Sequence, residues 1–367
     1  MTEISPSLVC RVGVDLAKRV YQVHCVDGFD KVVSCRSMSP DRFFEWCRTL
    51  QPGCVVAMES CSGAHHVCRR LGPLGLRMMI LPAQHVGAYR SAGKRSKNDA
   101  TDAAAICEAA SRPHLHAVPV KTAAQQGVLA IHRLREGYKE ERTALINRLR
   151  GLLAEFGLTF AQSPQALRSA LPDVLEDASN ELPGDLRLAL QRGLAHWDQL
   201  DAEMAWCEQR IAQHARSDSR AKKAAELMGV GPITASAVVA TVDDFTQFKS
   251  AKQFGGWAGL APSQNSSGGK TKLSGITKRG DVYLRTLLIQ GAKSAVMTAH
   301  QRSDPISQWL VQLKERVGWQ KAVVAMANKN ARILWCLMTR EDRFDPHHLP
   351  QRAAPAQAAT VATPAVA

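Results

Sequence analysis

The chain has 367 residues, enough for two domains, and 45% of them are hydrophobic, which is ordinary for a folded protein. Its formal charge of +14 indicates a polyanionic partner, nucleic acid first and an acidic membrane surface second, with a merely basic protein as the plainer alternative. No apolar stretch is long enough to span a bilayer and no secretory pattern opens the chain, so we expect a cytoplasmic, nucleoid-associated protein without membrane residence.

The expected fold of the first third is a mixed α/β sheet. Short apolar or alternating runs predict strands, and a Pro-Asp start followed by apolar residues at helical spacing predicts a helix. Three strands in succession and then alternating helices and strands favour this class of sheet. The expected elements are strands at 11–17, 21–27, 31–37, 54–60 and 76–82 and helices at 40–50 and 99–110.

Long helices follow. Apolar residues recur at three- and four-residue intervals from about 125 to 157, and a second stripe runs from Leu186 to Ile211. Two such helices joined by a Pro-containing segment predict an antiparallel helical coiled-coil arm, either an oligomerisation surface or a self-contained helical hairpin.

The last large region, 222–340, is expected to be mostly helical, with a Gly- and Ser-rich loop at 263–275. Within it, ELMGVGPITASAVVATV at 226–242 resembles a helix–hairpin–helix, whose Gly229-Val230-Gly231 turn would offer backbone amides to a phosphate. A tight turn between packed helices is the plainer interpretation. The tail at 351–367 is low-complexity and is expected to be disordered.

Cysteine and histidine spacing favours no metal site. The ten cysteines form no CxxC pair, and the even spacing of Cys47, Cys54, Cys61 and Cys68 crosses a helix, a strand and a loop. We therefore expect reduced, buried thiols.

Four acidic residues are candidates for a metal-binding site. Asp15 and Glu59 stand near the ends of two strands, and Asp99 and Asp102 share one face of a helix start. Carboxylates gathered in one place repel one another, and a divalent cation such as Mg²⁺ or Mn²⁺ resolves the repulsion. Taken singly, Asp99 is typical of a helix cap and Glu59 of a solvated strand end, whereas Asp15 within an apolar strand needs a partner.

These residues resemble a known family. GVDLAK at 13–18, AMES at 57–60 and KNDATDAAAI at 97–106 are similar to the D-E-D-D motifs of the "one-ten" insertion-sequence transposases, which include Piv-type DNA invertases. The resemblance implies a RuvC-like, ribonuclease-H-like domain in which Asp15, Glu59, Asp99 and Asp102 coordinate magnesium.

The stretch 254–292 offers Ser266, Ser267 and two glycines in a basic setting, where a serine hydroxyl can donate to a phosphate or attack it. On chemistry alone, a flexible basic loop that touches the DNA backbone is favoured. The resemblance extends here too: the run resembles the family's C-terminal domain, whose nucleophilic serine maps onto Ser267, with Ser266 adjacent and Ser274 in the wrong part of the motif. The expected nucleic-acid contacts are Lys270, Lys272, Lys278, Arg279, Arg285, Gly229 and Gly231.

The resemblance implies a complete reaction scheme. The serine would attack DNA to form a 5′-phosphoserine link, assisted by acid-bound Mg²⁺, in a dimer or tetramer whose acidic site is completed by another subunit's serine. A structured guide RNA would choose the double-stranded DNA of element ends and target, which leaves the protein to bind shape and backbone. The implied domains are 8–112 (RuvC-like), 122–217 (arm) and 222–340 (serine transposase), followed by the tail.

Three alternatives stay open from the sequence. A RuvC-like Holliday-junction nuclease would hydrolyse DNA without a covalent serine intermediate. An actin-like sugar kinase or ATPase would need Gly-rich phosphate turns, which DLAKRVYQ lacks. A non-enzymatic DNA-binding protein would not depend on the acids.

Overall fold

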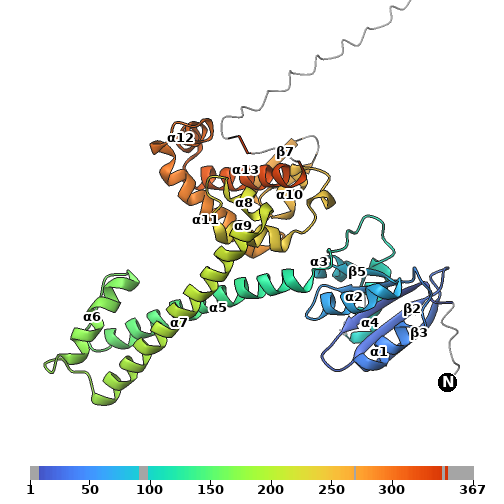
Figure 1. Ribbon diagram of the computed structural model, residues 1–367, viewed down its shortest axis with the longest axis horizontal. Helices are drawn as coiled ribbons and strands as arrows, with labels where there is room; N and C mark the ends of the chain where they lie inside the picture. The colour runs from blue at the N-terminus through green and yellow to red at the C-terminus, as the bar shows by residue number, and fades with distance from the viewer. Residues whose placement is uncertain (1–7, 91–97, 268–269, 341–343, 346–367) are drawn as a thin grey trace, which may run out of the picture. The chain divides into compact units, whose positions relative to one another are not determined.

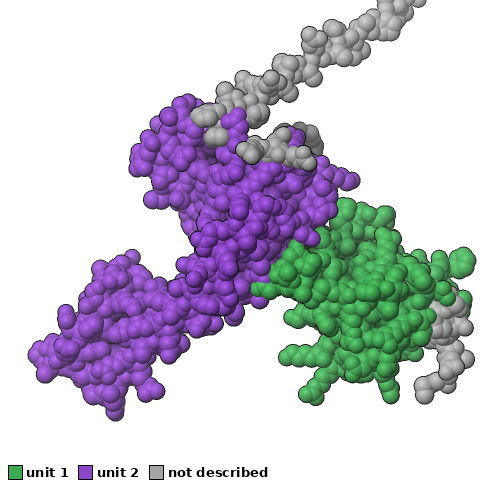
Figure 2. All heavy atoms as spheres, viewed as in Figure 1, with its two compact units in different colours: residues 1–127 green, residues 128–367 purple. Residues whose placement is uncertain are grey.

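The computed structural model describes residues 8–90, 98–267, 270–340 and 344–345 (Figure 1). Backbone contacts divide the chain into two compact units, residues 1–127 and 128–367 (Figure 2). The predicted tail at 351–367 and most of the basic stretch before Asn98 lie outside the described residues.

The first unit is built on a five-stranded sheet in the order β3-β2-β1-β4-β5. The first three strands pair antiparallel, and β1, β4 and β5 pair parallel, which confirms the expected mixed α/β sheet. Its elements are β1 (Arg11–Leu16), β2 (Tyr21–Val26), β3 (Val32–Met38), α1 (Pro40–Cys47), β4 (Val55–Glu59), α2 (Ala64–Leu71), η2 (Gly72–Leu74), β5 (Arg77–Leu81), α3 (Ala83–Val86), η3 (Gly87–Tyr89) and α4 (Asp99–Ala109).

Helices cover both faces of this sheet (Figure 1). Val14 and Met58 point toward α1 and α2 and share a core with Phe43. Because strand side chains alternate, Ala57 points to the other face, where it packs with Ile106 of α4. The face covered by α4 is therefore the one that Gly13, Asp15, Ala57 and Glu59 share.

Gly13 sets how closely α4 can approach the sheet. A Cβ atom there would lie 2.2 Å from the carbonyl oxygen of Ala103 and 2.5 Å from the backbone nitrogen of Cys107. Both are backbone atoms, so no side-chain rotation relieves the clash. The glycine in this strand is required for helix packing, a role that glycine within strands often has.

We predict that Gly13→Ala destabilises the first unit by about 3 kcal/mol or more, because the added methyl group must displace α4. Urea unfolding, with hydrogen exchange of α4 peptides to assign the loss, measures this. Gly28→Ala is the matched control: its new Cβ would meet only the Cys10 sulfur, at 3.6 Å, and should cost less than about 0.5 kcal/mol. Equal losses in the two variants would show that the close contact is not what limits stability.

Two long helices and a shorter one form the arm: α5 (Ala123–Ala154), α6 (Pro164–Glu176) and α7 (Gly184–Ser217). The sequence predicted α5 and α7, but α6 was missed because Pro172 lies inside it. Their core centres on Trp197, which is fully buried. The guanidinium groups of Arg142 and Arg168 lie 5.4 and 5.3 Å from its ring, and both arginines pair with Asp201.

The rest of the second unit is mostly helical, as expected, around a core of its own. The predicted loop at 263–275 is instead largely a β-hairpin, β6–β7. Ser, Asn and Gly are typical of loops, but here the two segments satisfy each other's backbone groups. The elements are α8 (Ser219–Ala225), α9 (Pro232–Thr241), η4 (Phe245–Gln247), α10 (Ala251–Trp257), β6 (Pro262–Ser267), β7 (Lys270–Ile276), α11 (Val282–Thr298), η5 (Ala299–Gln301), α12 (Pro305–Val317) and α13 (Trp319–Thr339).

A buried chain of hydrogen bonds joins four helices of this unit. His132 of α5 contacts Tyr283 of α11 through Nδ1 at 3.0 Å and Ser236 of α9 through Nε2 at 2.9 Å. Ser236 also contacts His214 Nδ1 of α7, at 3.0 Å. His132 is 1% exposed, and burial lowers its pKa to about 4, so it is neutral near pH 7.

We predict a pH-dependent loss of stability from His132. As pH falls from about 6.5 toward 4, the unfolded chain binds a proton that the folded chain refuses, so the free energy of unfolding falls, by up to about 3 kcal/mol. His132→Gln should therefore show a flatter stability–pH curve in urea unfolding at pH 7 to 4.5. His196→Gln is the control, because it makes the same substitution at an exposed position and so measures the effect of the residue change without the buried contacts. A His132→Gln curve parallel to that of the wild type would contradict the prediction.

Two further expectations concern the state of the cysteines and the presence of membrane-spanning helices. All ten cysteines are free, as expected, but Cys10, Cys35 and Cys61 are exposed rather than buried. Among the described helices, none is both long and apolar enough to cross a membrane.

Candidate active site

Asp15 and Glu59 stand side by side at one edge of the sheet. Val14 and Met58 are register partners on the parallel strands β1 and β4. Asp15 directly follows Val14, and Glu59 directly follows Met58. Both acids are half-buried, and by strand alternation both point to the face covered by α4. This register confirms the expectation that the ends of these two strands lie side by side.

The charges of Asp15 and Glu59 both affect the pKa of the Cys61 thiol. Burial first, and then the charges of Asp15 and Glu59, raise the pKa of the Cys61 thiol. Two carboxylates therefore act on one point just beyond the end of β4. Asp15 also has an interaction partner of its own, as a carboxylate in an apolar strand requires.

The start of α4, the helix that packs on this face of the sheet, carries the other two acids. Asn98 caps the helix, accepting a hydrogen bond from the Thr101 backbone at 2.8 Å. Asp102 is 6% exposed and pairs with Arg90 Nε at 2.7 Å. Asp99 is exposed, so the two acids of this helix differ in surroundings although they stand one turn apart.

Arg90 is the member of this site that the sequence did not single out. It lies just after η3, at the beginning of the basic stretch YRSAGKRSKN. Because that stretch holds several basic residues, nothing in the sequence alone distinguishes this arginine from the others. The signal that would have found it is Asp102 itself: a carboxylate on an otherwise Ala-rich, buried helix face needs a counter-charge.

The four acids are thus partly brought together. Within the part of the chain that the structure describes, no group of three or more His, Cys, Asp or Glu side chains is arranged to hold a metal ion. The strand register places Asp15 beside Glu59, and Asp102 is buried on the helix that covers the same face. A single four-acid cluster with Mg²⁺ stays a prediction.

The serine region lies on the β6–β7 hairpin, where Ser267 pairs with Lys270 and Ser266 with Thr271 in backbone register. Side chains from 266 to 271 lie outside the described residues. Beyond the hairpin tip, Lys272, Lys278 and Arg279 are exposed, so a nucleic acid could reach all three.

Three of the predicted nucleic-acid contacts differ from one another in exposure. Arg285 is 9% exposed because α11 turns it inward, so it differs from the exposed cations near it in the sequence. Gly229 has a packing reason for being glycine: at a φ of 83°, a Cβ would lie 2.6 Å from the Gly291 carbonyl oxygen. Gly231 is exposed at the N-cap of α9, as the helix–hairpin–helix interpretation requires.

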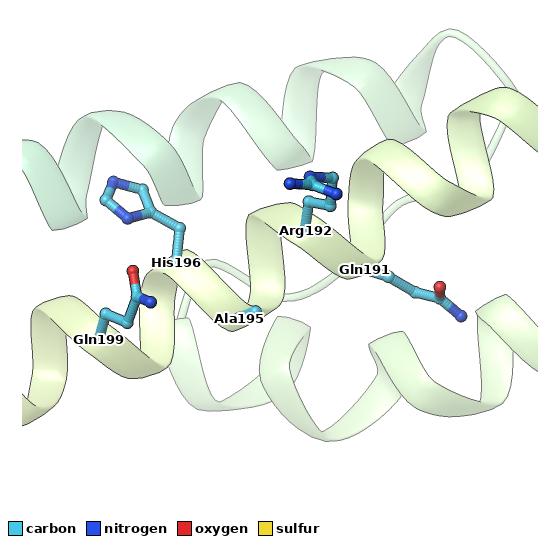
Figure 3. Close-up of a pocket in the computed structure, with 5 residues that line it drawn as sticks. All are labelled: Gln191, Arg192, Ala195, His196 and Gln199. Atoms are coloured by element: carbon cyan, nitrogen blue, oxygen red, sulfur yellow. The ribbon is translucent and has the colours of Figure 1, made fainter.

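A hollow of about 510 Å³ lies along α7 of the arm (Figure 3). Its lining residues all come from that one helix: Gln191, Arg192, Ala195, His196 and Gln199. No carboxylate lines it, so it offers none of the chemistry gathered at Asp15 and Glu59.

Comparison with known proteins decides the family. One family model, of the DEDD domain of IS110-type transposases, described as a transposase, matches residues 12–157. Another, described as the transposase IS116/IS110/IS902 family, matches residues 221–307. A probable family 20 transposase of Pseudomonas aeruginosa is 44% identical over 337 residues, covering 92% of this chain and 98% of the relative. The chain belongs to the IS116/IS110/IS902 family of transposases.

Other relatives agree. The transposase for insertion sequence element IS1111A of Coxiella burnetii is 38% identical, covering 91% of this chain and 90% of the relative. That for IS1328 of Yersinia enterocolitica is 34% identical, with 92% and 98% covered. The transposase is therefore an enzyme that cuts and rejoins DNA, and the two matched ranges contain the acidic face and the serine hairpin respectively.

We predict that Arg90→Met destabilises the transposase by about 1–3 kcal/mol, because Asp102 would keep a buried charge without its partner. Because the Arg90 side chain is 40% exposed, solvent screens part of the interaction and limits the loss. Urea unfolding measures the loss.

Arg112→Met is the matched control, since Arg112 pairs with Glu108 on the same helix with both side chains nearly half exposed. It should cost about 0.5 kcal/mol or less. Arg90→Met combined with Asp102→Asn should recover part of the loss. Equal costs for the two arginines would contradict the assignment of Asp102 as the buried acid that needs a cation.

Proposed function

We propose that the transposase exchanges DNA strands at an insertion sequence by means of two groups, a Mg²⁺-binding set of Asp15, Glu59, Asp99 and Asp102 and a nucleophile, Ser267. The observation that carries the proposal is the position of Asp15 and Glu59, each one residue beyond the register partners Val14 and Met58 on neighbouring parallel strands, on the face covered by α4. The sheet order, three antiparallel strands followed by two parallel ones, supports a RuvC-like, ribonuclease-H-like domain.

The donor chemistry fits a hard divalent cation. The groups offered are carboxylate oxygens, which Mg²⁺ and Mn²⁺ prefer. Asp102 already requires a positive partner in its buried position, and Arg90 supplies one. When bound by these acids, the cation would neutralise charge that develops on the reacting phosphate.

The serine chemistry is a pair of transesterifications. The Ser267 hydroxyl oxygen bonds to phosphorus and the bond from phosphorus to the 3′-oxygen breaks. The serine proton ends on the released 3′-hydroxyl, and a 5′-phosphoserine link remains. In the second step the 3′-hydroxyl of another strand attacks that phosphorus, and the serine oxygen leaves with a proton. Exposed Lys272, Lys278 and Arg279 would hold the DNA backbone beside the hairpin.

The family resemblance supports the wider assembly that we propose. A structured guide RNA would select element ends and target in double-stranded DNA, and a dimer or tetramer would bring the serine of one subunit to the acids of another, as expected for relatives of Piv-type invertases. The three-domain division at 8–112, 122–217 and 222–340 is supported by separate apolar cores for the sheet, the arm and the C-terminal helices.

We predict that Ser267→Ala abolishes strand exchange, by about a thousandfold or more, while the affinity for DNA is retained. The test uses the full chain with Mg²⁺ and a plasmid carrying the gene's native flanking DNA. Denaturing gels detect the covalent protein–DNA species, and amplification across the junction detects exchange. Glu59→Gln should lose both signals.

Ser266→Ala and Ser274→Ala are the matched controls, and both should keep the covalent species. If Ser267→Ala cuts DNA at the wild-type rate with no covalent species in either protein, the enzyme is a hydrolytic nuclease of the Holliday-junction type. If Glu59→Gln keeps full activity, the acids have no catalytic part.

A further inference from the structure

Two buried polar atoms without partners lie at the root of the β6–β7 hairpin. We define this root as residues 259–261 and 277–280, the two chain segments that meet where the hairpin leaves the helices. Backbone hydrogen bonds join them: Thr277 N donates to Ala261 O at 2.9 Å, and Lys278 N donates to Gly259 O at 3.2 Å. Within the described residues, Thr277 Oγ1 and Arg285 Nη1 are buried and have no hydrogen-bond partner.

Arg285 reaches the root from α11. A Cβ on Gly259, which has a φ of 72°, would lie 2.9 Å from Arg285 Nη1 and 2.1 Å from the Arg279 carbonyl oxygen. The guanidinium is therefore covered by the two segments of the root. Among the described residues it forms no ion pair. The acid nearest to it in the sequence, Asp281, caps α11 by accepting a hydrogen bond from Leu284 N at 2.8 Å.

An unpaired buried guanidinium is costly, because the charge has lost water and gained nothing in return. Natural proteins pair nearly all such groups, so one left unpaired calls for an explanation. Here the neighbours add positive charge, since Lys278 and Arg279 are both exposed beside it. The missing partner is thus an anion, and the planar fork of an arginine fits two oxygens of a phosphate.

The root also carries backbone strain. Lys278 has a φ of 55°, in the left-handed region that a side chain other than glycine seldom adopts. The segment that covers Arg285 is therefore held in a conformation that its own sequence disfavours. Both the unpaired charge and the strained lysine favour a different position of 277–280 when an anion is present.

We propose that Arg285 and Thr277 form a phosphate site that a DNA strand completes, with the segment 277–280 moving aside to admit a backbone phosphodiester. The inference rests on the proposed function in taking this hairpin to carry the nucleophile, and it adds a second phosphate contact at the hairpin's base. Free of DNA, the transposase holds Arg285 covered and unpaired, and bound DNA gives it a partner.

The test uses opposite signs. Arg285→Met keeps most of the volume of the side chain but removes the unpaired charge, so the melting temperature of the full chain should rise, by about 2 °C. Its affinity for a mixed-sequence DNA duplex of about 30 base pairs should fall about tenfold, and the slope of log affinity against log salt should decrease by about one. An arginine that only supports the fold would lower both quantities together.

Arg279→Met is the matched control: it removes the same charge from an exposed neighbour, so it should weaken DNA binding and leave the melting temperature unchanged. Thr277→Val covers the case in which Arg285→Met does not fold, since it removes the other unpartnered atom at constant shape. It should raise the melting temperature and weaken DNA binding severalfold.

A fall in melting temperature in both Arg285→Met and Thr277→Val, or unchanged DNA affinity in the variants that fold, overturns the proposal. An RNA duplex of the same length is measured in parallel, and a loss confined to RNA also overturns the assignment to DNA. Repeating the binding in Ser267→Ala separates the two proposals: the effect of Arg285→Met on affinity should persist there even if Ser267 proves not to be the nucleophile.

Discussion

The close approach of α4 to β1 is the contact on which the first unit depends. It is possible only because position 13 carries no side chain, and backbone atoms of Ala103 and Cys107 occupy the space that a Cβ would take. The approach lays the beginning of α4 over the face to which Asp15 and Glu59 point, so the buried Asp102 belongs to the same side of the sheet. The place of α4 beside Asp15 and Glu59 thus depends on backbone packing at Gly13, two residues before Asp15 in the same strand.

The two functional regions treat buried charge in opposite ways. Asp102 has its counter-charge within the chain, in Arg90, whereas Arg285 has none among the described residues. Arg90 stabilises the buried Asp102 carboxylate, and under the proposed function a bound divalent cation would take over that role. Arg285 has no acid to play the corresponding part, because its neighbours Lys278 and Arg279 are themselves basic. At the hairpin root, the excess of positive charge seen in the composition therefore leaves a buried arginine without a counter-charge.

Much of this could be predicted from the sequence, because it follows from local pattern. Runs such as RVGVDL and the stripe along α7 specify elements to within a few residues, and parallel strands place Asp15 beside Glu59 once the strand order is known. What failed depends on partners distant in sequence. The loop-like composition of 263–275 did not reveal the hairpin, and Pro172 obscured α6. The burial of Arg285 likewise could not be read from a run of basic residues. Periodicity does not say which residues pack across an interface.

The chain of Tyr283, His132, Ser236 and His214 has a directional property. Each neutral imidazole has one donor and one acceptor nitrogen, so the direction of its hydrogen bond on one side sets the direction on the other. Arg135, which can only donate, also interacts with the Tyr283 hydroxyl and favours donation from that hydroxyl to His132 Nδ1. His132 Nε2 is then the donor toward Ser236, whose hydroxyl can either donate to His214 or accept from it as well. The tautomer of His132 is thus set from the α11 end of the chain, and only that of His214 is left for the serine hydroxyl to select.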